Sequence, residues 1–157
     1  MSKPENPHPS EKGQSLVELA MSLTFLLILL AGVADLGRAF FTFIALRDAA
    51  QEGAAYASIA RTNISDGMKC TEIIARVQDT SNTQIVDLDD TNVTIIMDGY
   101  PCASAGNSNA CYGRAVEVRV EYPNFRLTTP LLGTILGAQT LPITASIIDT
   151  VLTPPCH

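Results

Sequence analysis

The chain has 157 residues, a formal net charge of −6 and a pI near 4.7. Its ten lysines and arginines are scattered without forming a patch, which argues against nucleic-acid binding because phosphate contacts need clustered basic side chains. Apolar residues make up 46 % of the sequence, enough for one domain of modest size and an apolar helix besides.

The first twelve residues, MSKPENPHPSEK, predict an unstructured leader. They contain three prolines and no apolar cluster. Two lysines balance two glutamates, so the charge of the leader indicates the orientation of a following membrane helix only weakly.

An uncharged run from Leu19 to Ala34 predicts a membrane-spanning helix. Counted from Leu16, such a helix rises about 28 Å, close to the ~30 Å hydrocarbon core of a bilayer. Glu18 precedes the run, and a carboxylate near the bilayer centre costs on the order of 2.5–3.5 kcal/mol. Glu18 therefore has either a functional role or a position at the headgroups.

A cleavable secretory signal is an alternative interpretation of the same run. Gly32-Val33-Ala34 has small residues spaced as in a signal-peptidase site. Against this alternative, the run is at or beyond the long end of ordinary signal cores, and the helical pattern continues past Ala34.

No proline occurs between Asp35 and Arg61, which predicts one helix over 14–61, about 70 Å long, with its first half in the membrane. Asp35 and Arg38 are spaced to form an ion pair on it. Two stripes of small residues recur every four positions and fit either contacts with other helices or packing on the chain's own domain. They are Ala45, Ala49, Gly53 and Ala57, and Ala50, Ala54 and Ser58.

The remainder, 62–157, predicts a small α+β domain with an antiparallel sheet. Asp66 is a candidate N-cap for an amphipathic helix that runs to about Asp79 and buries Cys70. Apolar alternation then predicts strands at 84–88 (weakly), 92–98, 114–122 and 141–152, with a short helix or turn at 129–136.

Four cysteines lie beyond the apolar run, where a protein with a cytoplasmic N-terminus faces an oxidising space. Cys102 and Cys111 bracket a polar loop, and we expect a disulfide between them. Cys70 with Cys156 is a weaker expectation. A zinc site is disfavoured because the spacing is not CxxC and no histidine is near.

No catalytic constellation or cofactor motif is apparent, so we expect neither an enzyme nor a cofactor. The two histidines are His8, in the leader, and His157, the last residue. The acidic cluster 87–90 lacks the spacing of a calcium loop, which favours a solvated turn.

The arrangement of Gly13, four uncharged residues, Glu18 and an apolar helix resembles the processing site of type IV prepilins. The resemblance implies that a prepilin peptidase cuts between Gly13 and Gln14, leaving 1–13 as a leader. It also implies that Glu18 remains in the mature helix and pairs with the N-terminus of a neighbouring subunit.

A second resemblance is to the TadE-like proteins of tight-adherence (Tad, or Flp) pilus systems. It rests on Asp35-Leu36-Gly37-Arg38 after the membrane run and on an alanine-rich stretch ending in Glu52-Gly53-Ala54. Residues 114–147 are also similar, with a valine-rich strand and a threonine-proline-leucine turn. Leu19 departs from the family pattern, in which an aromatic residue is commoner.

These resemblances imply a minor pilin or pseudopilin of a Tad pilus used for adhesion. The protein would cross the bacterial cytoplasmic membrane once, with its C-terminal domain outside the cytoplasm. Its partners would be the prepilin peptidase, other pilin subunits, the inner-membrane assembly platform and the lipid bilayer. Two alternatives stay open: an uncleaved membrane-anchored assembly factor, and a binding module secreted by cleavage after Ala34.

Overall fold

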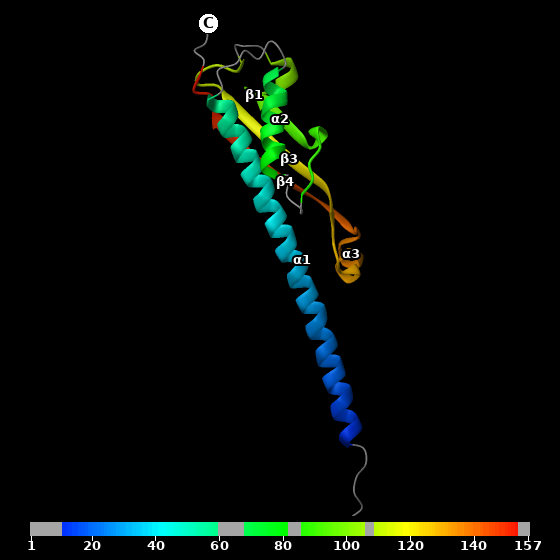
Figure 1. Cartoon of the computed structure of the whole chain (residues 1–157). Coiled ribbons are helices and arrows are strands. Elements are labelled where there is room, and N and C mark those ends of the chain that lie inside the picture. The colour runs from blue at the N-terminus through cyan, green and yellow to red at the C-terminus, as the bar shows by residue number, and fades with distance from the viewer. Residues whose placement is uncertain (1–10, 60–67, 82–85, 106–108, 154–157) are drawn as a thin grey trace, which may run out of the picture.

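The computed structural model describes residues 11–59, 68–81, 86–105 and 109–153. Helix α1, Glu11–Ile59, has 49 residues and is about 73 Å long at 1.5 Å per residue. Its C-terminal half lies against a small domain, whereas its N-terminal half projects away alone (Figure 1). The predicted long apolar helix is thus confirmed. Most of the leader and the predicted helix end at Arg61 lie outside the described residues.

The domain combines helices with one four-stranded antiparallel sheet, as predicted for an α+β protein. The sheet order is β2-β1-β3-β4. The strands are β1 (Val93–Met97), β2 (Tyr100–Pro101), β3 (Ala115–Arg126) and β4 (Thr140–Thr150). The other elements are α2 (Met68–Ser81), the 3-10 turns η2 (Asp90–Asn92) and η3 (Cys102–Ser104), and α3 (Pro130–Leu136).

The core lies between the sheet and the two helices α1 and α2. Val116, Val118 and Val120 of β3 are fully buried, as their alternation with charged residues predicts. Ile73 and Val77 of α2 meet them from the helical side, at the predicted i, i+4 spacing.

Both stripes of small residues on α1 turn toward this core. Ala49, Ala50, Ala54, Ala57 and Ser58 are almost completely buried, and Ala45 packs partly against the same cluster. Small side chains allow the helix to approach the sheet and α2 closely. The sequence left open whether the stripes contact other helices or pack on the chain's own domain. In the structure both stripes pack on the domain.

Three details differ from the predicted strands. Of the weak strand predicted over 84–88, the described residues contain only an isolated bridge at Val86. The short strand β2 was not predicted, although Asp98-Gly99 is a typical hairpin turn sequence and both residues have positive φ, 49° and 85°. Finally, β3 continues beyond Tyr122 to Arg126, with an irregularity between Tyr122 and Phe125.

Candidate functional site

The N-terminal half of α1 is an uncovered apolar surface. Every residue from Gly13 to Leu30 is exposed, including eleven large apolar side chains between Leu16 and Leu30. By length and composition α1 is able to cross a membrane, and none of its most apolar stretch is buried in the protein. The helix therefore fits a membrane anchor.

The residues of the predicted processing site lie at the start of this surface. Gly13 and Gln14 are in the first turns of α1, and both are exposed. Gln14 and Glu18 line one shallow groove with Val17 and Met21, so the glutamate lies on the same helix face as the residue that cleavage would make N-terminal. The geometry keeps the carboxylate of Glu18 accessible to another molecule.

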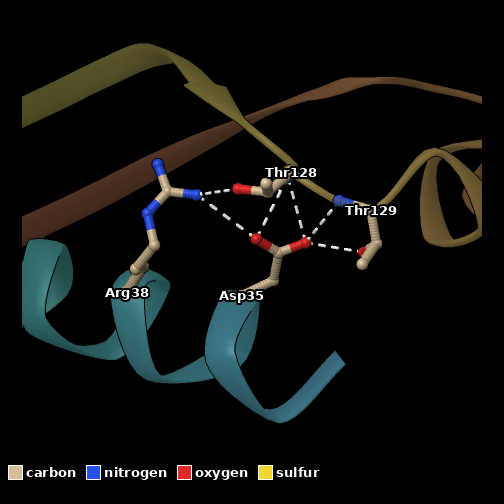
Figure 2. A network of polar contacts seen from close by, with 4 residues as sticks. All are labelled: Asp35, Arg38, Thr128 and Thr129. Carbon is tan, nitrogen blue, oxygen red and sulfur yellow. Dashed lines mark hydrogen bonds and ion pairs between the residues drawn. The ribbon is translucent and has the colours of Figure 1, made fainter. Parts of the chain in front are cut away.

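A polar junction marks the outer end of the apolar surface (Figure 2). The side chain of Asp35 is only 2 % exposed, and its carboxylate accepts hydrogen bonds from the loop between β3 and α3. The backbone N–H of Thr128 lies 3.0 Å from both carboxylate oxygens. Thr129 donates to Oδ2 through its backbone N–H at 2.8 Å and its hydroxyl at 2.6 Å.

These donors favour the ionised carboxylate. The hydroxyl of Thr129, helped by the two backbone N–H groups, outweighs desolvation and holds the pKa of Asp35 well below its usual range. Asp35 therefore bears a negative charge that is fully hydrogen-bonded inside the protein.

Arg38 closes the junction from the next turn of α1. Its guanidinium donates to Oδ1 of Asp35 at 3.2 Å, which confirms the ion pair predicted from the spacing. It also donates to the hydroxyl of Thr128 and lies 5.3 Å from the ring centre of Phe125. The sequence alone did not predict the contacts with Thr128 and Thr129, which lie 93 and 94 positions away from Asp35.

Comparison with known proteins identifies a similarity in the N-terminal part of the chain. The family model described as TadE-like protein matches residues 13–55. Over these residues the chain is TadE-like. The predicted resemblance is thus confirmed for the segment that runs from Gly13 to the glutamate-glycine-alanine triplet. No curated protein and no solved structure matches the chain. The similarity of 114–147 stays a prediction.

The structure explains two motifs of the TadE-like segment. Asp35 and Arg38 fasten the helix to the loop before α3. Gly53, in the triplet near the end of the segment, is buried where a Cβ would lie 2.5 Å from Cγ2 of Val77 and 3.4 Å from Cγ1 of Val118. Only glycine allows α1 to approach α2 and β3 this closely.

The predicted disulfide between Cys102 and Cys111 is wrong. Cys102 is bonded to Cys70, with the two Cα atoms 6.0 Å apart. The short hairpin formed by β1 and β2 turns the buried Cys102 toward the first turn of α2, so the fold, rather than proximity along the chain, selects the partner. Cys111 is also disulfide-bonded, and Cys156 lies outside the described residues.

The described part of the chain shows no cluster of three or more histidine, cysteine or acidic side chains able to hold a metal ion. Within it, the features that carry functional information are the exposed apolar helix, Glu18 and the Asp35 junction.

Proposed function

We propose that this chain is a minor pilin-like subunit that takes part in assembling a Tad pilus. Residues 16–34 anchor it in the bacterial cytoplasmic membrane, and the domain that follows lies outside the cytoplasm. The observation that carries this proposal is the N-terminal half of α1, which projects from the domain without any cover of its own.

The exposed apolar area of this half of α1 supports a location in the membrane rather than in water. Eleven large apolar side chains between Leu16 and Leu30 are 45–71 % exposed. If each costs about 1–2 kcal/mol in water, the total is on the order of 10–20 kcal/mol, comparable with the whole stability of a domain. Lipid and neighbouring pilin helices are the surroundings that remove this cost.

Glu18 provides a site at which the helix pairs with a neighbouring subunit. Cleavage after Gly13 leaves a positive α-amino group on Gln14, one helical turn from the carboxylate. In apolar surroundings a carboxylate needs a cation, and the amino group of an adjacent subunit supplies one. The pairing would set the register of helices as they leave the bilayer.

The continuity of α1 argues against the secreted module. The helix runs through Ala34 without a break, and the next residue is the buried Asp35. Cleavage at that position would have to open the helix directly beside the junction that holds the domain to it. The uncleaved assembly factor is distinguished from the pilin-like subunit by its N-terminus.

The deciding experiment on processing is mass spectrometry of the mature N-terminus. We expect the wild-type protein to begin at Gln14 and Gly13→Ala to retain the leader. Gly37→Ala, on the same helix, is the control and should mature normally. A wild-type protein that begins at Met1 would favour the uncleaved factor, and one that begins at Asp35 would favour the secreted module.

Glu18→Ala tests the role in assembly. The variant should insert and be cut normally, because it removes a charge from a membrane helix. Its recovery in sheared filaments or crosslinked complexes should fall by a factor of hundreds, since breaking a buried ion pair costs about 3–5 kcal/mol. Ser22→Ala, one turn along the same groove, is the matched control. Equal recovery of both variants would show that Glu18 only contacts headgroups.

A further inference from the structure

We propose that α3 is a second membrane contact, whose apolar tip enters the lipid surface beside the outer end of the spanning helix. The tip is formed by Ile135 and Leu136. This inference rests on the proposed function, because it requires residues 16–34 to lie in a bilayer.

The position of α3 along α1 sets its depth. Thr128 and Thr129 bind Asp35, the first residue after the apolar run, and α3 begins at the next residue, Pro130. From there the chain continues toward the N-terminal half of α1, and α3 is the element of the domain nearest to that half (Figure 1).

A largely apolar groove lies between the end of α3 and helix α1. Gly32 and Leu36 line it from α1, and Leu136 of α3 and Leu141 of β4 line it from the opposite side. The end of α3 therefore faces the stretch of α1 that contains Gly32 and Leu36, where the apolar run ends, so the tip lies near the expected edge of the hydrocarbon.

The tip is exposed and held in place. The side chains of Ile135 and Leu136 are 72 % and 55 % exposed. Gly137 ends the helix in the left-handed conformation, at φ 73°, and the following turn is tied back where the N–H of Leu127 donates to the carbonyl of Gln139 at 3.0 Å. The fold thus presents two large apolar side chains that it does not bury.

The charges of this end of the domain match a phospholipid surface. Residues 122–143, which form this end, contain no acidic residue and one basic residue, Arg126, in a chain whose net charge is −6. Arg126 is exposed, whereas the half-exposed Arg38 forms an ion pair with Asp35 and adds little net charge. Anionic phosphates therefore meet cationic and apolar side chains at this end.

The chain contains no tryptophan, so a single introduced tryptophan reports its own depth. We would place Ile135→Trp in the full-length protein in vesicles of phosphatidylethanolamine and phosphatidylglycerol. Lipids brominated near the carbonyl end of their acyl chains then quench any indole at the interface. Ile148→Trp is the matched control, because Ile148 is similarly exposed, at 68 %, near the far end of β4.

We expect the brominated lipids to quench Ile135→Trp about twofold or more beyond Ile148→Trp, with blue-shifted emission. Equal quenching of the two variants would overturn the proposal. Blue-shifted emission without lipid quenching would also overturn it, since a second copy of the chain would then cover the tip. Leu26→Trp, in the apolar half of α1, tests the membrane anchor itself. If it is quenched and Ile135→Trp is not, only this proposal fails; if neither is quenched, the membrane anchor fails as well.

Discussion

Replacing Asp35 by alanine should weaken the attachment of the loop between β3 and α3 to helix α1. The change leaves two backbone N–H donors, those of Thr128 and Thr129, without their acceptor. Each orphaned donor costs about 1–3 kcal/mol, and the lost hydroxyl bond adds about 1 kcal/mol. Relief from the desolvation of the carboxylate offsets part of this sum. The net destabilisation is therefore about 2–4 kcal/mol.

For a chain of this size, that destabilisation lowers the thermal midpoint by roughly 5–15 °C. The assay is unfolding of the full-length protein in detergent micelles, followed by circular dichroism. Hydrogen–deuterium exchange should rise first in the loop 127–129 and in β4. Asp48→Ala removes an exposed carboxylate from the same helix and is the control.

If Asp35→Ala and Asp48→Ala unfold within about 0.5 kcal/mol of each other, the scatter expected of surface substitutions, then the hydrogen bonds of Asp35 do not stabilise the domain. Asp35→Asn should lie between alanine and wild type, because an amide oxygen still accepts hydrogen bonds while the adjacent NH2 group cannot.

The same residue predicts a dependence on pH. The folded pKa of Asp35 is depressed below the ordinary aspartate pKa of 3.8, so the unfolded state binds the proton more readily. The stabilisation is complete above this value and is lost as the pH falls below it toward the folded pKa. Asp35→Asn should not show the loss of stability at low pH that protonation of Asp35 causes in the wild type. Identical curves of stability against pH for the wild type and Asp35→Asn would contradict this prediction.

Two further predictions concern the domain core. Cys102→Ser should lower the free energy of unfolding by about 3–4 kcal/mol, because the disulfide to Cys70 spans a separation of 32 residues. Non-reducing peptide maps of the wild type should show the two cysteines joined, and free thiols at both positions in exported protein would refute the pairing. Gly53→Ala should cost about 1–3 kcal/mol by forcing a methyl group against Val77, whereas Gly37→Ala, with no atom within 4 Å of the added Cβ, should leave stability unchanged or raise it. Equal stabilities of the two alanine variants would disprove the close approach.

Features carried by local pattern could be predicted from the sequence. The length of the uncharged run and the absence of proline determine one long helix, since helix formation depends on neighbours within four residues. The alternation of Val116, Val118 and Val120 likewise determines the buried face of β3, because successive side chains of a strand point to opposite sides. The pair of Asp35 with Arg38 follows from one helical turn.

Contacts between distant parts of the chain were decided by the tertiary structure alone. Nothing in the spacing indicates that Asp35 binds Thr128, or that Cys102 joins Cys70 in preference to the nearer Cys111. Spacing along the chain sets only the entropy of closing a loop, which grows slowly with its length. The packing of α1 and α2 on one sheet determines which of these groups come within reach of a bond.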